Sequence, residues 1–561
     1  MEGKRMRKKL AAALLVSTMV LTSFAGCGKK KGMTLDIFDA AANVQGLQTG
    51  WFGKVVKDKF DLELNIIAPQ VAGDAIFQTR SATGNLGDIV LLDATQFATC
   101  VKNGLIQDIS AEMADCENLK VFEKQIKAYN DGIDGGAGKT YGIPCQMVNT
   151  SPTDYSQDVI YSSPMLRWDY YEELGCPEIK DLNGLLDVLE QMMKNHPTNA
   201  TGDKCYPLSL WADWDGGDNM LGIANVVQLT TWYGEKIKGS AILKKDNTFT
   251  KLTDKTATYY KLLKFLNTAY QRGLVDPDSG TQDWNAACDK MKAKQVYLMW
   301  YSWQVGFTND TASLNDGSAF IFVPVNDQTY YSDSDTYFGS GRVIGVGSKV
   351  KGDKLKKVME FLDWYASPEG AVYQHDGLKD FNYSVGSDGK YTLMNDNALA
   401  ANLPVPAEYG GGGYSDGFNA INQWIVDSTN INPLTGEKYA STYWSTYKEA
   451  TMTNMKKAWQ TRFGAEEPVE YMKKNGKLLI SPSVSVALLD DPSDISVIRN
   501  QCNQLLCDSS WKMIFAKTDA EFDAMWDEMT SKMDGFDYNK LYEFDCNNYQ
   551  KEVDAKLAAT K

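Results

Sequence analysis

The chain has 561 residues, with 57 basic and 72 acidic side chains that give a formal net charge of −15 at pH 7. This acidity argues against a nucleic-acid partner, whose phosphates would repel it, and the length is enough for two or three domains. The two histidines, His196 and His375, do not form a metal-ligand pattern. We therefore expect no metal and no cofactor.

Residues 1–27 have the pattern of a lipoprotein export signal. A basic start leads into the apolar stretch 10–24, which is too short for a stable transmembrane helix, and Ala25-Gly26-Cys27 follows. Small residues before a cysteine resemble the bacterial lipobox, although Phe24 stands where leucine is usual. Cys27 is thus predicted to carry a lipid at the extracellular face of the cytoplasmic membrane, with 28–32 as a flexible tether. The alternative is an ordinary secretory signal with a coincidental cysteine.

Nine further cysteines follow this signal. Their odd number and the lack of zinc-like CxxC spacing favour isolated, mostly buried thiols over a disulfide framework. They are Cys100, Cys116, Cys145, Cys176, Cys205, Cys288, Cys502, Cys507 and Cys546.

The first part of the mature chain alternates between strand and helix patterns. Residues 62–66 alternate apolar and polar side chains, and 88–92 is a continuous apolar run, which is typical of a parallel strand buried on both faces. This order predicts an open, mostly parallel α/β sheet. The predicted strands are 35–38, 62–66 and 88–92, and the predicted helices are 46–60, 74–83 and 94–103.

A second α/β unit follows residue 141. Its helices 256–272 and 353–366 each place apolar side chains on one face, and Thr518-Asp519-Ala520-Glu521 is a capping box before a third helix. Strands are predicted at 206–210, 295–300, 320–325 and 343–346. The glycine-rich segment 409–414 is predicted to be a flexible loop between two tyrosines.

Five motifs in order resemble an extracellular solute-binding family of ABC importers. The chain is most similar to its oligosaccharide-binding class, in the lipoprotein group resembling LplA. One segment, Asp376–Tyr383, follows the family pattern only in part. The motifs are Gly87-Asp88-Ile89-Val90, Lys139-Thr140-Tyr141-Gly142-Ile143-Pro144, and the segments 166–175, 361–370 and 516–523.

The resemblance implies an α/β fold of the periplasmic-binding-protein type, with two hinged lobes that close on a ligand like a Venus flytrap. It places the crossings between the lobes near 142–148, 290–297 and 336–345. The first lobe is then 33–145 plus 295–340. The second lobe is 146–294 plus 341–561.

A sugar site needs flat aromatic rings for C–H faces and planar polar groups for hydroxyls. Ligands in open α/β sheets bind beyond the carboxyl ends of strands, so we select residues that follow predicted strands or lie on a crossing. The richest stretch is 211–219, where aromatic residues alternate with carboxylates; the alternative there is a structural turn. The candidates are Asp39, Asn43, Asp93, Gln146, Trp211, Asp213, Trp214, Asp215, Trp300, Trp303, Tyr409 and Tyr414.

Trp51 and the segment 333–335 could also bind a ligand or a metal, but we interpret both as structural. Trp51 lies on a predicted helix and is expected to pack inside rather than bind ligand. Asp333-Ser334-Asp335 offers two carboxylates for calcium but lacks the full EF-hand pattern, so we interpret it as a solvated turn.

The leading hypothesis is a monomeric, non-catalytic binding protein that captures a carbohydrate and presents it to the transmembrane subunits of an ABC permease. A secreted glycoside hydrolase is the enzymatic alternative, but it needs two carboxylates about 5 to 10 Å apart across a cleft. Neither Asp213 nor Asp215 is marked by the sequence as such an acid. A surface adhesin or sensor with the same hinged fold is the third possibility.

Overall fold

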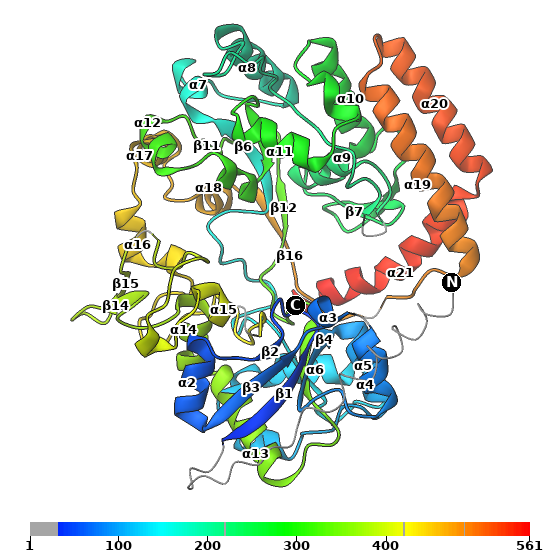
Figure 1. Cartoon of the computed structure of the whole chain (residues 1–561). Coiled ribbons are helices and arrows are strands. Elements are labelled where there is room, and N and C mark those ends of the chain that lie inside the picture. The colour runs from blue at the N-terminus through cyan, green and yellow to red at the C-terminus, as the bar shows by residue number, and fades with distance from the viewer. Residues whose placement is uncertain are drawn as a thin grey trace, which may run out of the picture.

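The structure is a computed structural model in which the chain forms two lobes, one above the other (Figure 1). It describes residues 32–73, 75–217, 220–395, 397–418, 421–486 and 488–560. The predicted export signal, the Cys27 anchor and most of the tether lie outside these residues, as do Asp218 and Asn219 of the predicted aromatic stretch. Separate hydrophobic cores define what we call the lower lobe and the upper lobe: one core fills the upper lobe, and two lie on the two faces of the sheet in the lower lobe.

The lower lobe contains a six-stranded sheet in the order β2-β3-β1-β4-β13-β5. The strands β1, β3 and β4 are parallel, and β13 is antiparallel to both of its neighbours. The predicted strands at 35–38, 62–66 and 88–92 thus form a parallel α/β centre, but β2 is also antiparallel to β3, so the sheet as a whole is mixed rather than mostly parallel. The strands are β1 (Met33–Asp39), β2 (Gly46–Leu47), β3 (Leu62–Ile67), β4 (Ile89–Asp93), β5 (Gly142–Pro144) and β13 (Arg342–Val346).

Helices cover both faces of this sheet, and this is why β4 is buried along Ile89–Leu92. The first helix begins at Trp51 rather than residue 46, because Gly46 and Leu47 pair with β3 instead. The helices are α2 (Trp51–Phe60), α3 (Pro69–Ala72), α4 (Ala75–Ala82), α5 (Ala94–Lys102), α6 (Glu123–Asp131), α13 (Gly352–Tyr365), α14 (Pro368–Asp376), α15 (Tyr414–Phe418) and α16 (Ser445–Ala450). A hairpin of β14 (Tyr383–Val385) and β15 (Tyr391–Leu393) extends from the lobe.

The upper lobe has a central antiparallel sheet in the order β10-β6-β11. A second small sheet has the order β7-β8-β9. The strands are β6 (Ser162–Arg167), β7 (Lys236–Lys238), β8 (Ala241–Leu243), β9 (Phe249–Lys251), β10 (Leu298–Tyr301) and β11 (Phe320–Phe322). The helices around them are α7 (Trp168–Glu173), α8 (Leu182–Asn195), α9 (Ala224–Leu229), α10 (Thr258–Gln271), α11 (Trp284–Lys292), α12 (Thr311–Asp316), α17 (Asn454–Phe463) and α18 (Pro468–Lys474).

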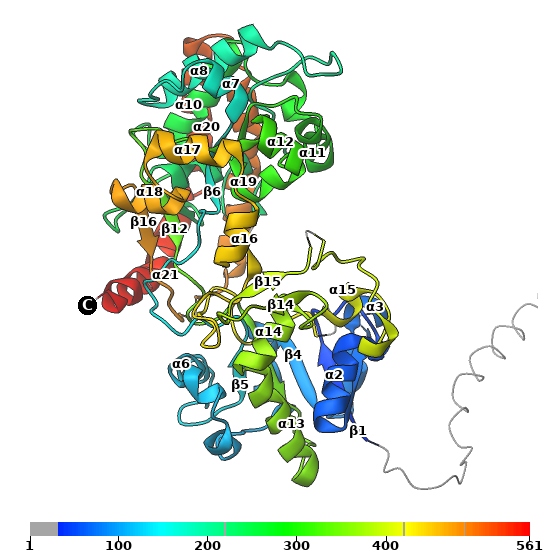
Figure 2. The ribbon, with the colours of Figure 1, turned by 90° about the vertical axis from the view of Figure 1, so that its left-hand side faces the viewer.

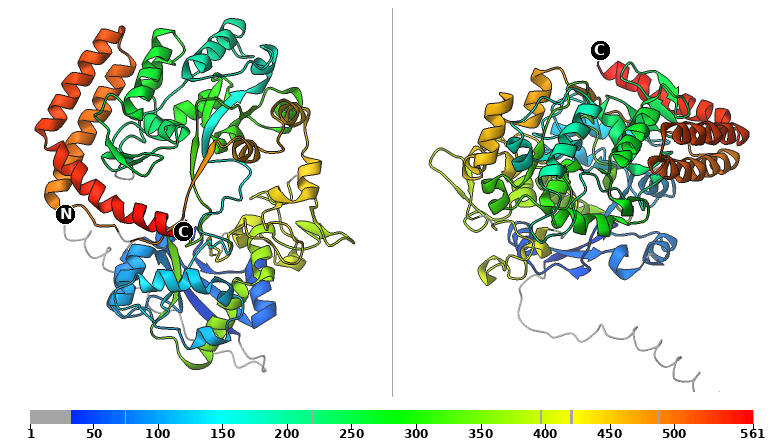
Figure 3. Two further views of the ribbon diagram at one scale, coloured as in Figure 1. Left: turned by 180° about the vertical axis from the view of Figure 1, so that it is seen from behind. Right: turned by 90° about the horizontal axis from the view of Figure 1, so that it is seen from above.

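Three long helices complete the upper lobe at its outer side. They are α19 (Ser493–Ile514), α20 (Asp519–Gly535) and α21 (Tyr538–Ala559), and α19 packs on α10. The Thr518 side chain accepts a hydrogen bond from the Glu521 N–H, which is one half of the predicted capping box, whereas the Glu521 side chain accepts from the N–H of Lys517 rather than from that of Thr518. Figure 3 shows α21 running back from this outer side toward the junction of the lobes.

The predicted division of the chain between the lobes differs from the observed one. Residues 295–340 contain β10 and β11, which pair with β6 in the upper lobe, whereas 341–447 belong to the lower core. The segment 290–297, which was predicted to cross between the lobes, stays in the upper lobe and joins α11 to β10. The apolar strand β13 instead fills the sheet between β4 and β5, where a Cβ on Gly345 would lie 2.5 Å from a Phe97 ring atom.

The chain passes between the two cores at three places, near 148–155, 331–342 and 447–455 (Figure 2). Next to the second crossing, β12 (Tyr330–Asp333) pairs in parallel with β16 (Leu478–Ser481). The end of α21 reaches this pair, because the Lys556 Nζ lies 2.6 Å from the Ser481 Oγ. These crossings form the junction between the lobes.

All nine cysteines named above are free thiols in the part of the chain that the structure describes, and seven of them are buried. Among the described residues, none of the helices has the length and apolar character that a membrane span requires.

Candidate ligand-binding site

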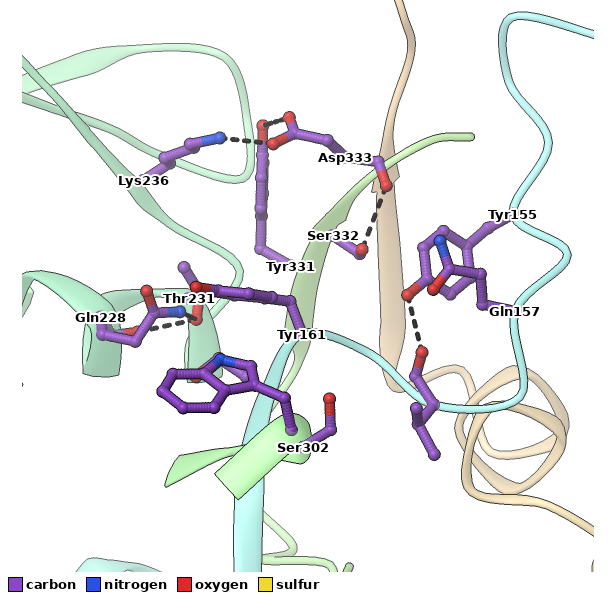
Figure 4. Close-up of a pocket in the computed structure, with 13 residues that line it drawn as sticks. Tyr155, Gln157, Tyr161, Gln228, Thr231, Lys236, Ser302, Tyr331, Ser332 and Asp333 are labelled. Atoms are coloured by element: carbon purple, nitrogen blue, oxygen red, sulfur yellow. Dashed lines mark hydrogen bonds and ion pairs between the residues drawn. The ribbon is translucent and has the colours of Figure 1, made fainter. Parts of the chain in front are cut away.

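A pocket of about 600 Å³ opens on the upper lobe beside the crossings (Figure 4). Its walls come from the segment before β6, from α9 and the 3₁₀ turn after it, from the start of β7, from the turn after β10, and from β12. Five separate parts of the chain thus meet at one cavity. Its volume is in the range that holds a small-molecule ligand.

Two aromatic rings in this pocket are exposed. Tyr161 is 59% exposed and Trp303 is 39% exposed, although both are large hydrophobic side chains. The buried Tyr301 supports both, with ring centroids 5.1 Å from Tyr161 and 5.4 Å from Trp303. The two exposed rings are therefore held in place by the core behind them.

The core behind these rings is a cluster of tryptophans. The Trp211 ring lies 5.3 Å from that of Trp214 and 4.7 Å from that of Trp284. Trp284 in turn lies 5.4 Å from Trp303. Edge-to-face and tilted packing of this kind fixes ring orientations, since aromatic pairs prefer these arrangements.

The opposite wall of the pocket is polar. The Lys236 Nζ lies 2.5 Å from the Asp333 Oδ2, and the Tyr331 hydroxyl donates to the Asp333 Oδ1 at 2.9 Å. Burial alone would raise the pKa of Asp333, but the charge and hydrogen bond of Lys236, with the charge of Lys556, hold that pKa below its ordinary value. Asp333 is therefore an anion whose charge is balanced by lysine.

A second pocket of about 430 Å³ adjoins the first and shares Tyr161 and Gln228 with it. Its other described walls are Trp214, Tyr301, Met220, several glycines and the apolar side chains of Ala224 and Val227 on α9. One of these, Val227, is half-buried.

The predicted stretch 211–219 is divided between core and pocket. Trp214 lines the second pocket, whereas Trp211 is buried in the cluster behind it. The carboxylate of Asp213 accepts a hydrogen bond from the Trp284 N–H at 2.9 Å. The carboxylate of Asp215 accepts from the Ala224 N–H and from the indole N–H of a tryptophan in α19. Both carboxylates thus fix the loop against neighbouring helices. Burial raises the pKa of Asp215 to about 6, although its two hydrogen bonds act in the opposite direction.

The other predicted aromatic residues also differ in exposure. Of the candidates Trp300 and Trp303, only Trp303 lines a pocket. Trp300 is 2% exposed and packs against Trp232, so it supports the site from within. Tyr414 is likewise buried and stacks on Trp51 at 5.6 Å. Tyr409 is half-buried against Phe381.

The remaining candidates lie on the lower lobe. Strands β1 and β4 run toward the upper lobe, so the Asp39 and Asp93 that end them lie at the facing edge (Figure 1). Asn43 and Asp93 are exposed there, and Asp93 caps α5 by accepting from the Gln96 N–H. Gln146 lies just before the first crossing, where its carbonyl accepts from a threonine hydroxyl at 2.6 Å.

Asp39 differs from its neighbours because it is fully buried. Its Oδ1 accepts from the Ala41 N–H at 2.8 Å, while its Oδ2 has no hydrogen-bond partner among the residues that the structure describes. Burial raises the pKa of Asp39 to about 7, against the opposing effects of backbone hydrogen bonds and of Arg342. This side chain does not reach the surface of the lower lobe.

Apart from Trp303, sequence reasoning missed the residues that line the first pocket, among them Tyr161, Gln228, Lys236, Tyr331 and Asp333. The predicted solvated turn at 333–335 is wrong for Asp335, which is buried and accepts hydrogen bonds from the N–H and hydroxyl of Ser156. The sequence did contain one signal for this pocket: Tyr161 lies directly before β6, which is the first strand after the crossing near 148–155.

Comparison with known sequences and structures agrees with this architecture. Residues 45–372 match the family of bacterial extracellular solute-binding proteins, and the chain belongs to that family. Its two-lobed fold is similar to that of solved solute-binding proteins.

Particular relatives are distant in sequence. Lipoprotein LipO of Bacillus subtilis is 23% identical over 424 residues, which cover 70% of this chain and 76% of LipO. The substrate-binding protein FusA of S. pneumoniae, solved with kestose, is 14% identical with a TM-score of 0.57, covering 93% of this chain and 99% of FusA. A solute-binding protein of Bifidobacterium longum infantis, described as HMO-binding, is 13% identical with a TM-score of 0.58, covering 94% and 99%.

Proposed function

We propose that the protein captures an oligosaccharide in the upper-lobe pocket and delivers it to the permease of an ABC importer. The observation that carries this proposal is the pair of exposed rings, Tyr161 and Trp303, opposite a polar wall. An exposed ring that the core holds rigidly offers a flat surface for the C–H face of a sugar. FusA and the HMO-binding protein, which share the fold, support an oligosaccharide as the ligand class.

The polar wall complements these rings. Lys236 and Asp333 hold each other in fixed positions, so their remaining hydrogen-bonding capacity is oriented before a ligand arrives. A sugar that stacks on the rings would place its hydroxyls against this wall. Closure of the lower lobe would then bring Asn43 and Asp93 toward the same ligand, because both are exposed at the facing edge. A ligand that contacts both lobes stabilises the closed state.

Catalysis is not part of the proposal. A glycoside hydrolase needs two carboxylates across its cleft. Among the described residues that line the first pocket, Asp333 is the one carboxylate, and its charge is balanced by Lys236. A non-transport adhesin with this fold would bind glycans in the same way. Glycan uptake that is lost in cells without the gene would favour transport, and unchanged uptake would favour the adhesin.

The location and state of the protein complete the proposal. Cys27 would carry the lipid anchor that holds the protein, as a monomer, at the extracellular face of the cytoplasmic membrane. The homology to a lipoprotein supports this anchor. Mass spectrometry of the membrane-extracted protein would show a diacylated Cys27 as the new N-terminal residue.

A thermal-shift screen tests the ligand class. The purified chain from residue 28 onward is mixed with neutral glycans of two to six units, with peptides and with amino acids. We expect one glycan series to raise the melting temperature and to be recovered chemically unchanged. A peptide that stabilises the protein while every glycan fails would refute the proposal, and release of reducing ends would favour the hydrolase.

A further inference from the structure

The two upper-lobe pockets are neighbours that meet at shared residues. Tyr161 and Gln228 line both, and the pockets measure about 600 and 430 Å³. Each volume is within the range of a small-ligand site, so each has room for at least one sugar ring. Two such spaces with a common boundary form a groove rather than two isolated cavities.

Tyr161 is fixed at this boundary from two directions. Its carbonyl accepts a hydrogen bond from the Ser302 N–H at 3.0 Å, which ties the segment before β6 to the turn after β10. Its ring meets the buried Tyr301 ring at 67° with centroids 5.1 Å apart. The exposed part of the ring therefore stands between the pockets without depending on a ligand for its position.

Gln228, on α9, lines the same boundary. Its Nε2 donates to the Thr231 Oγ1 at 3.4 Å, and Thr231 lines only the first pocket. One turn of α9 earlier, Ala224 lines only the second pocket, as does Val227. Helix α9 thus runs along both spaces, with a polar residue where they meet.

The walls of the two pockets differ in chemistry. The first contains Trp303 and the Lys236–Asp333 pair, which suit stacking and hydroxyl binding. The described walls of the second are Trp214, Tyr301, Met220, Val227 and small residues, besides the shared Tyr161 and Gln228. Among the described residues of the two pockets, the charged side chains therefore line the first.

We propose that these pockets are two subsites of one groove, that the ligand is a chain of sugar units long enough to occupy both, and that Tyr161 contacts it at the junction. The inference rests on the proposed function. The terminal unit binds in the first pocket, beside Trp303 and the Lys236–Asp333 pair, and the chain extends past Tyr161 into the second. Affinity then depends on chain length, up to the length that fills both spaces.

Length series of neutral oligosaccharides test this inference. Malto-, cello-, xylo-, manno- and fructo-oligosaccharides of two to six units are titrated by calorimetry against the wild-type protein. In the series that binds, we expect affinity to rise at least tenfold from the shortest to the longest member. Val227→Trp, which fills the second pocket, should reduce the affinity for the longest ligand at least tenfold and that for the shortest less than twofold.

A matched control separates a blocked pocket from a general effect of added bulk. Val497 is 56% exposed on α19 and lines neither pocket, so Val497→Trp should leave every affinity unchanged. Ala224→Leu makes a smaller intrusion on the second pocket and serves if Val227→Trp melts early. Tyr161→Ala should weaken long and short ligands alike, because both touch the boundary.

The outcomes distinguish this inference from the proposed function. Binding of a glycan with equal affinity at all lengths, or an equal loss at all lengths in a folded Val227→Trp protein, overturns the two-subsite groove and leaves glycan binding intact. A folded Val227→Trp protein that binds the longest ligand as the wild type does also overturns it. If no glycan binds the wild-type protein, the proposed function fails and the groove fails with it.

Discussion

Trp300 and Trp303 are three residues apart and should respond oppositely to truncation. Trp300 is 2% exposed in the upper core, whereas Trp303 is 39% exposed in the first pocket. We expect Trp303→Ala to weaken ligand binding with a small effect on folding. We expect Trp300→Ala to destabilise the fold without changing the affinity of the molecules that remain folded.

The size of each effect follows from the contacts. An aromatic stacking contact contributes about 0.5–1.5 kcal/mol, so loss of the Trp303 face should raise the dissociation constant about 2- to 13-fold. Complete truncation of a buried tryptophan costs about 3–5 kcal/mol, which applies to Trp300. The partly exposed Trp303 should cost about 1 kcal/mol of unfolding free energy.

Two measurements on each variant decide the matter. Urea unfolding gives the change in unfolding free energy, and calorimetric titration with the glycan found by screening gives the change in affinity. The reasoning is refuted if Trp303→Ala binds that glycan as tightly as the wild type does. It is equally refuted if Trp300→Ala unfolds at the wild-type urea midpoint.

Three further outcomes are expected. Burial raises the pKa of Asp39 to about 7, so the native state holds a proton that the unfolded chain releases near pH 4. The stability of the wild-type protein should therefore fall as the pH rises from about 4 to 7. Asp39→Asn should flatten this part of the plot of urea midpoint against pH. An equal slope in both proteins would contradict this. Arg499→Met should cost about 3–5 kcal/mol in urea unfolding, because the buried Asp545 loses its bidentate partner; a loss below about 1 kcal/mol would contradict it. Since Lys236 and Asp333 neutralise each other, glycan affinity should change less than about twofold between low salt and roughly 0.5 M NaCl, and a tenfold loss would indicate a charged ligand contact.

The fold could be predicted where local pattern decides it. The continuous apolar run of β4 and the one-faced apolar spacing of α10 and α13 each identified an element within a few residues. The division into lobes could not be found in this way. Strand β13 pairs with β5 and β4, which lie about 200 and about 250 residues earlier in the chain, and nothing in its own sequence identifies these partners.

The site was harder to predict because exposure is a property of packing. Trp211 and Trp214 differ little in their sequence surroundings, but one is enclosed by three aromatic rings and the other reaches the second pocket. Lys236 was missed for a related reason. Its role depends on Asp333, which lies on a different strand, and the pair exists only after the upper lobe has assembled.

The three crossings have a consequence for how the chain folds as it emerges. The lower lobe lacks a central strand until β13 has been made, and the upper lobe lacks α19, α20 and α21 until residues 493–559 have been made. Neither lobe can complete its core before these elements exist, so a growing chain keeps apolar surface exposed until then. For a member of an extracellular family this delay is useful, because a chain that has not yet folded remains competent for translocation. A stop codon anywhere before α21 should accordingly give a protein that is degraded rather than a smaller binding protein.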